Sequence, residues 1–134
     1  MTGREIYKKA LVLINEYADH GEEWRYDTAI MESNAPTLIN MIAMMTDELD
    51  CTVKGKKYGI NDHLPAQIKT LDDELVQHPY ITMGVIPYGL AYLLLAEENA
   101  ARASEFYGLF IRERDALERR FRPTNRHTVT DCYK

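Results

Sequence analysis

The sequence contains four histidines, which are the residues most often used as metal ligands. They are His20, His63, His78 and His127. No two of them stand three or four residues apart, so no helix can present a histidine pair to one metal ion. We therefore expect no metal site. The sequence leaves open a site that the fold would assemble from a histidine and nearby acids, as at His20 with Glu22 and Glu23 or at His78 with residues 72–74.

The hydroxyl and thiol side chains give no sign of covalent catalysis. Ser33 and Ser104 are the two serines, and neither lies in the GxSxG turn that presents a nucleophile. Cys51 and Cys132 form no CxxC pair and have no activating neighbour, so we expect reduced thiols. We assign no catalytic, cofactor-binding or metal-ligating residue.

Paired glutamates near the end of an apolar segment suggest one enzyme class. All-α pyrophosphohydrolases of nucleoside triphosphates hold Mg²⁺ with an EExxE motif and a later ExxD, because Mg²⁺ prefers oxygen ligands on a common face. Here Glu97 and Glu98 begin EENAA, and Ala101 stands where the third glutamate would be. Residues 113–115 read ERD, which also misses the spacing. A magnesium-dependent hydrolase is therefore the third candidate function.

Length and charge limit the remaining choices. The chain has 134 residues, of which 46% are hydrophobic and 28% charged, as in one globular domain with one core. The net charge of −5 disfavours a nucleic-acid-binding protein, although lysines in the Lys54–Tyr58 loop could touch phosphate. No apolar run approaches the ~20 residues that span a bilayer. The N-terminus lacks a signal-peptide pattern, so we expect a cytosolic protein.

The N-terminal half of the sequence predicts helices. Thr2 and Glu5 have capping-box spacing, and a helix with an apolar stripe follows up to about Gly21. Between residues 24 and 49 we predict that Pro36 divides the pattern into a short helix ending near Glu32 and a second helix. Ser33 or Asn34 would cap the second helix. Its predicted inner face is Leu38, Ile39, Ile42, Met45 and Leu49, broadened by Met41 and Met44.

The middle of the chain is the least regular. Residues 50–66 contain two glycines and a proline, which predict an irregular insertion or a small hairpin with arms CTV and KYGI. Residues 67–75 (QIKTLDDEL) predict one or two turns of helix, which His78, Pro79 and Tyr80 would end.

Two helices follow. Pro87 suits the first turn of an apolar helix that leaves the core near Asn99, and Gly89 predicts close approach of another backbone. Residues 100–121 predict a last helix, with Pro123 beyond it. The expected fold is a mostly-α bundle of four to five helices in one domain (1–121), with the insertion at about 50–66. Residues 122–134 would form an extended, partly strand-like arm.

The order of these segments resembles that of small virion proteins of tailed bacteriophages and prophages, the head–tail connector (adaptor or head-completion) proteins. The resemblance spans about residues 29–121. It rests on Leu38–Ile42, Leu71–Leu75, Pro87–Ala91 with Glu97 and Glu98, and Phe106–Ile111. The Lys54–Tyr58 loop and the Cys132 tail have no counterpart in it.

This resemblance implies a non-enzymatic, all-helical subunit that forms or joins a ring next to the portal. Its partners would be copies of itself, the portal and other head–tail junction proteins, with DNA only as passing cargo. It implies no cofactor, no small-molecule substrate and no membrane, and a location in the host bacterial cytoplasm during assembly and then in the virion. The alternative function is that of a small helical interaction or regulatory protein.

Overall fold

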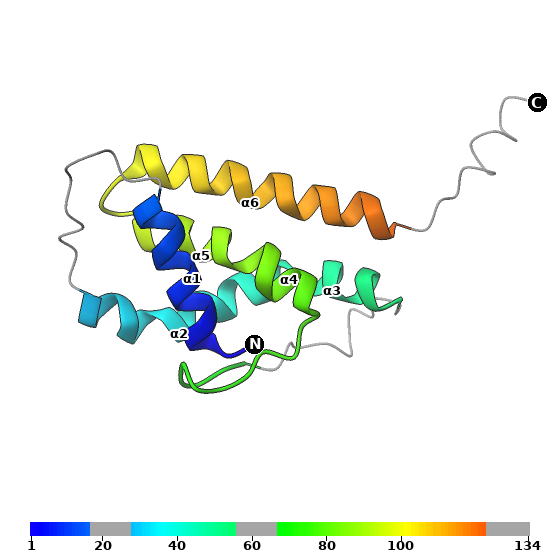
Figure 1. Ribbon diagram of the computed structural model, residues 1–134, viewed down its shortest axis with the longest axis horizontal. Helices are drawn as coiled ribbons and strands as arrows, with labels where there is room; N and C mark the ends of the chain where they lie inside the picture. The colour runs from blue at the N-terminus through cyan, green and yellow to red at the C-terminus, as the bar shows by residue number, and fades with distance from the viewer. Residues whose placement is uncertain (17–27, 56–66, 123–134) are drawn as a thin grey trace, which may run out of the picture.

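The computed structural model describes residues 1–16, 28–55 and 67–122. These residues form six helices, confirming the mostly-α class but not the expected four to five (Figure 1). The helices are α1 (Gly3–Glu16), α2 (Thr28–Met45), α3 (Asp47–Lys54), α4 (Pro79–Gly84), α5 (Ile86–Leu95) and α6 (Ala100–Phe121). A single antiparallel bridge joins Thr2 to Glu74.

Helix α5 is the centre of the fold. It contacts α1, α2, α4 and α6, and in Figure 1 it lies among the other helices beneath α6. Its sequence is apolar on most sides, which is typical of a helix buried on most sides. Pro87 lies in the first turn, as expected, and Leu90, Ala91 and Leu95 are fully buried. Burial of α5 therefore ties the other helices to one core.

Gly89 is the point at which α2, α5 and α6 meet. A Cβ atom at this position would lie 2.9 Å from both Cδ1 and Cγ2 of Ile42 in α2, and 3.1 Å from Cδ2 of Phe110 in α6. Such distances are too short for a carbon–carbon contact. The predicted close approach is confirmed, but the neighbouring groups are side chains rather than another backbone.

Replacing Gly89 by alanine tests this contact. We expect Gly89→Ala to lower the free energy of unfolding by about 1–2 kcal/mol, because overpacking costs more than the helix propensity that alanine returns. Gly108→Ala in α6 is the matched control, since no atom lies within 4 Å of its Cβ position. That change should raise the free energy of unfolding by up to about 1 kcal/mol. Urea denaturation measures the free energy of unfolding of both variants. Equal effects of the two substitutions would contradict the tight packing at Gly89.

Helix α1 begins with a partial capping box. The Thr2 hydroxyl accepts a hydrogen bond from the Glu5 amide at 3.2 Å, as predicted. The Glu5 carboxylate, however, accepts from the Thr2 hydroxyl rather than from its amide. Ile6, Ala10 and Ile14 then form the buried stripe of the helix. The expected end at Gly21 lies outside the described residues.

Helix α2 runs unbroken through Pro36, so the predicted division into two helices is wrong. Proline inside a helix costs about 3 kcal/mol. Here the apolar face continues across it, since Met31, Ala35, Ile39 and Ile42 are all buried and share one side of the helix. Burial of a large aliphatic side chain contributes roughly 1.5–3 kcal/mol, so this face offsets the cost of the proline.

The predicted inner face of this helix is also partly wrong. Met41, Met44 and Met45 are 49%, 51% and 49% exposed. Helix α2 ends at Met45, where the fully buried Thr46 starts α3 and changes the direction of the chain. The methionines therefore lie on the outer side of α2.

The hairpin expected within residues 50–66 is not supported. Residues 51–53 (CTV) belong to α3, which ends at Gly55 with a φ of 72°. This left-handed conformation favours glycine. The other expected arm, residues 57–60, lies outside the described residues. The helix was missed because glycine and lysine after Val53 resemble turn chemistry.

Residues 67–78 form turns instead of the predicted helix. The Asn40 side chain holds both backbone groups of Ile68, donating to its carbonyl at 2.8 Å and accepting from its amide at 2.9 Å. Asp73 accepts from the amides of Lys69 and Thr70 at 2.8 and 3.0 Å. These bonds satisfy backbone groups that a helix would otherwise pair. Leu71 and Leu75 are buried nonetheless.

Helix α4 begins where the sequence predicted that a helix would end. His78 is its N-cap, with Nδ1 accepting from the Tyr80 amide at 3.1 Å, and Pro79 occupies the first turn. Proline is tolerated there because its missing amide has no helical partner in any case. The last helix, α6, has the predicted bounds, and Asn99 caps it by accepting from the Arg102 amide at 3.2 Å. Apart from Arg122, the expected C-terminal arm lies outside the described residues.

The turn at Asp73 predicts a pH effect. The amides of Thr70 and Lys69 hold the pKa of Asp73 below its ordinary value. A lowered pKa in the folded state contributes stability that is present above the unfolded pKa, about 3.9, and is lost as the pH falls through the folded value. The difference in unfolding free energy between wild type and Asp73→Asn should therefore be largest near neutral pH and shrink below about pH 4. Urea denaturation across this range measures it, and a constant difference would contradict the assignment.

Candidate functional site

The histidine that the structure describes has a structural role. His78 caps α4 through its ring nitrogen, and its backbone amide donates to Asp50 Oδ1 at 2.7 Å. Its ring also lies against Tyr80, with 4.8 Å between the centroids. His20, His63 and His127 lie outside the described residues. Within those residues, no three His, Cys, Asp or Glu side chains come close enough to hold a metal ion.

Among the described residues, Ser33, Ser104 and Cys51 lie on three different helices. Ser33 is exposed on α2 and Ser104 is exposed on α6, whereas Cys51 is buried in α3. Cys132 lies outside the described residues.

The two acidic segments of the hydrolase hypothesis occupy different parts of the molecule. Glu97 and Glu98 are exposed after the end of α5, beside the start of α6. Glu113 and Asp115 lie more than halfway along α6, paired with Arg112 at 3.3 Å and Arg114 at 3.4 Å. At 1.5 Å rise per residue, Asp115 is roughly 24 Å along the helix from Asn99. The described residues bring no set of carboxylates together in the way that this hydrolase needs.

Sequence reasoning missed a buried polar cluster at the junction of α2, α3 and α4. Asp50 binds Lys54 Nζ at 2.8 Å and the His78 amide, while Lys54 also donates to the carbonyl of Val76. Gln77 Nε2 donates to the carbonyl of Ala43 at 2.7 Å. The spacing of Asp50 and Lys54, four residues apart on one helix, was the available signal. The cluster holds residues 76–78 against α3. It also gives Lys54 two partners within the protein, Asp50 and the carbonyl of Val76, so a bound phosphate is not needed to explain this lysine.

One neighbouring acid stands apart from this network. Asp47 is buried in the first turn of α3, where the helix dipole favours a negative charge. Its Oδ2 has no hydrogen-bond partner within the part of the chain that the structure describes. Asp47 has no second carboxylate or histidine grouped with it as a metal site among those residues.

Asp50 tests whether the cluster is structural. We expect Asp50→Asn to lower the free energy of unfolding by about 1–3 kcal/mol. The Asp50 side chain is only 8% exposed, and the substitution removes the charged partner of Lys54. Asp115→Asn is the control: its side chain is 47% exposed and its ion pair with Arg114 is a surface pair. That change should cost less than about 1 kcal/mol. If Asp50→Asn is instead more stable than wild type, the Asp50 carboxylate serves a function rather than the fold.

The outer side of α2 is the main apolar surface. Met41, Met44 and Met45 are each about half exposed, and their spacing places them on adjoining turns of one helix. We call these three residues the methionine face. Methionine is polarisable and adapts to irregular partners, so clusters of it occur at protein-binding surfaces. The tyrosines add less, since Tyr7 is buried and Tyr92 stacks on Tyr107 at 5.0 Å.

A groove lies beside the methionine face, between the first half of α2 and the end of α5. Its volume is about 460 Å³. The apolar residues that line it are Ile30, Met31, Leu38, Leu93 and Leu94, and the acids are Glu97 and Glu98. We call it the acidic groove. Neither glutamate forms an ion pair with a described residue.

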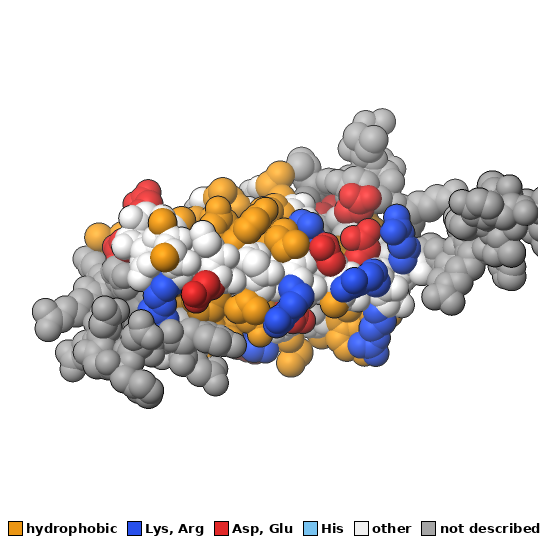
Figure 2. All heavy atoms as spheres, turned by 90° about the horizontal axis from the view of Figure 1, so that it is seen from above, with side chains coloured by type: hydrophobic (Ala, Val, Ile, Leu, Met, Phe, Trp, Pro, Cys, Tyr) orange, Lys and Arg blue, Asp and Glu red, His pale blue; other side chains and the backbone are white. Residues whose placement is uncertain are grey.

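The opposite end of α6 carries arginines and aromatic rings. Arg120 lies over the rings of Tyr80 and Phe121, at 5.4 and 5.6 Å from their centroids. Arg119 and Arg122 are exposed beside them. We call these five residues the arginine tip. Figure 2, which looks down on α6, shows Lys and Arg side chains gathered toward its C-terminal end, with acids among them.

Comparison of the chain with protein-family models, curated proteins and solved structures finds no match in any of the three. Within the described residues, none of the helices combines the length and the apolar character that a membrane crossing requires. The surfaces of the molecule are therefore the basis on which its function can be inferred.

Proposed function

We propose that this protein is a non-enzymatic subunit of the head–tail junction of a tailed bacteriophage or prophage, which forms or joins a ring next to the portal. It would act in the host bacterial cytoplasm during assembly and then in the virion. The resemblance described above supplies the idea. The methionine face is the observation that carries it, because an apolar helix face open to solvent suits docking onto another protein layer.

Several residues of the resemblance lie in the core, although Met41, Glu97 and Glu98 are exposed. Ile42, Gly89 and Phe110 come from three of its four motifs and meet in a single contact. Leu71 and Leu75, from the remaining motif, are buried as well. These apolar side chains belong to one hydrophobic core. They carry no reactive group, which favours a function in geometry over one in chemistry.

The two other candidates have less support. A helical interaction or regulatory protein would use the same methionine face. Only the identity of the protein that binds this face distinguishes that function from a role in the head–tail junction. The magnesium-dependent hydrolase needs carboxylates on a common face, and the described acidic segments lie far apart along α6. No observation on the described residues favours it.

Binding to the portal protein tests the proposal. The portal of the phage or prophage that carries this gene is immobilised, and the full-length chain is titrated onto it in surface plasmon resonance. We expect Met41→Gln with Met44→Gln to weaken binding by at least about tenfold, equivalent to roughly 1.4 kcal/mol, through loss of apolar burial. Both residues are exposed, so the fold should persist, which circular dichroism checks.

Met83→Gln is the control for this experiment. Met83 is 51% exposed, as Met44 is, but lies on α4 rather than on α2. It should bind the portal as wild type does. Wild-type protein that shows no affinity for the portal would refute the proposal and favour a regulatory protein with another partner.

A further inference from the structure

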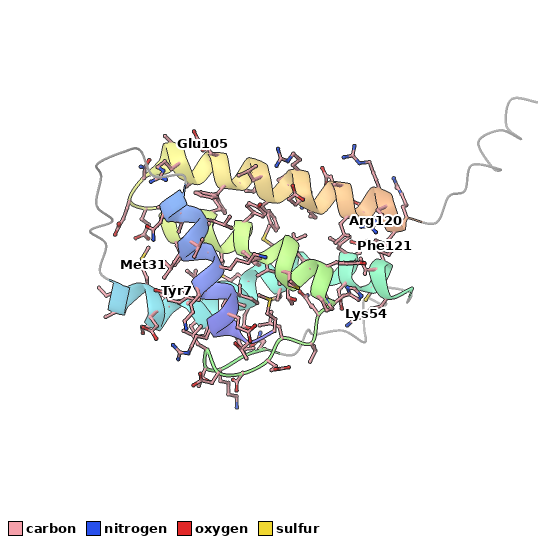
Figure 3. The ribbon with its side chains drawn as sticks, viewed as in Figure 1. Tyr7, Met31, Lys54, Glu105, Arg120 and Phe121 are labelled. Atoms are coloured by element: carbon pink, nitrogen blue, oxygen red, sulfur yellow. The ribbon has the colours of Figure 1, made fainter. Side chains whose placement is uncertain are left out.

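The two ends of the molecule differ in charge and shape. Figure 3 shows Met31 and Glu105 at one end, and Arg120 and Phe121 at the other. The first end holds the acidic groove, with Glu97 and Glu98 on its rim. The second holds the arginine tip, in which three arginines lack a carboxylate partner among the described residues, whereas Arg112 and Arg114 have one each.

The two surfaces cannot satisfy each other within one molecule. Arg119 stands twenty positions after Asn99, which follows the glutamates, so the helix separates them by roughly 30 Å at 1.5 Å per residue. The Debye length at physiological ionic strength is about 8 Å, so these exposed charges are screened from each other. Each surface therefore keeps its charge available to a second molecule.

Their shapes are complementary as well as their charges. The acidic groove has an apolar floor, and Ile30 on its wall is 59% exposed. The arginine tip presents the exposed ring of Tyr80, which lies 5.8 Å from that of Phe121, with the Arg120 guanidinium against both. Tyrosine and arginine are the residue types that contribute most at protein interfaces. Aromatic rings can fill an apolar groove while the guanidinium groups remain at its polar rim.

We propose that the acidic groove of one copy of this chain receives the arginine tip of the next copy. Glu97 and Glu98 then face Arg119, Arg120 and Arg122 across the contact, and Tyr80 lies over the apolar floor. The proposal deepens the function proposed above and rests on it for the closure of the contact into a ring.

Such a contact joins two different surfaces of the same chain. A head-to-tail interface of this kind repeats by rotation, and it closes into a ring or continues as a filament. It also leaves the methionine face on α2 outside the contact, since none of its three residues lines the groove. One subunit could then bind its neighbours and a separate protein layer at the same time.

Charge exchange tests the pairing in the full-length protein. Sedimentation velocity at low ionic strength should show wild type associating as concentration rises. Glu97→Arg with Glu98→Arg makes the groove repel the tip, and Arg119→Glu with Arg122→Glu makes the tip repel the groove. Each double variant alone should sediment as a 15.5 kDa monomer. An equimolar mixture should associate again, because both of its contacts, Arg groove with Glu tip and Glu groove with Arg tip, are complementary.

A charge-matched control separates this effect from net charge. Lys8→Glu with Lys69→Glu changes the charge as much as the tip variant does, at exposed positions on α1 and on residues 67–78. This control should associate as wild type. A wild type that stays monomeric at the highest concentration and lowest salt would overturn the proposal. A mixture of the two charge variants that remains monomeric would overturn it as well.

The result of the portal-binding experiment does not depend on the result of the self-association experiment. If the groove variant loses self-association but still binds the portal, both proposals stand. If wild type never self-associates yet binds the portal, this inference falls and the proposed function remains. If wild type self-associates through the exchanged charges and ignores the portal, the inference stands and the proposed function falls.

Discussion

At Gly89 the side chains of Ile42 and Phe110 press against the backbone of α5 from two sides, and no Cβ atom would fit between them. This contact fixes how closely α2 and α6 approach the central helix. Because interiors are packed like crystals, a shift of a few tenths of an ångström here would move both helices as units. The missing side chain at Gly89 therefore allows α2 and α6 to pack closely on α5 at this point.

The residues that pack the core are largely different from the exposed residues that are candidates for binding. Ile42, Leu90 and Phe110, three of the apolar residues that the resemblance rests on, are buried in the core, whereas Met41 of the same motifs is 49% exposed. Among the described residues, the candidate surfaces are the outside of α2, the groove near the start of α6 and the tip at its end. The buried polar groups serve the fold too, since Asp50 and Gln77 hold residues 76–78 against α3 and α2. A site for chemistry would require such groups to converge on a cavity.

A helix was predicted correctly where its cap, its apolar stripe and its terminating residue all agree. The prediction failed where burial or side-chain hydrogen bonds outweighed the local helix propensity. Helix α6 has an Asn cap, a regular stripe and a following proline, and its bounds were predicted correctly. Pro36 gave a strong local signal for a break, but burial of Met31, Ala35, Ile39 and Ile42 on one face outweighs it. Residues 67–75 have helical spacing, yet Asn40 and Asp73 take over their backbone hydrogen bonds from the side. The Asn40 bonds join residues 28 positions apart, and such a contact leaves no periodic trace in the sequence.

The candidate surfaces were harder still to predict. Glu97 and Glu98 were identified in the sequence as part of an incomplete EExxE motif. Ile30 lies more than sixty residues earlier, and only the fold brings it to the same groove. The methionines were assigned to the core because side-chain type alone does not distinguish a buried stripe from a binding face. The arginine tip joins Tyr80 of α4 to the end of α6, two segments that the sequence separates by forty residues. Because α6 runs from beside the groove to the tip, the contact that we propose would make the length of this helix the spacing between neighbouring copies.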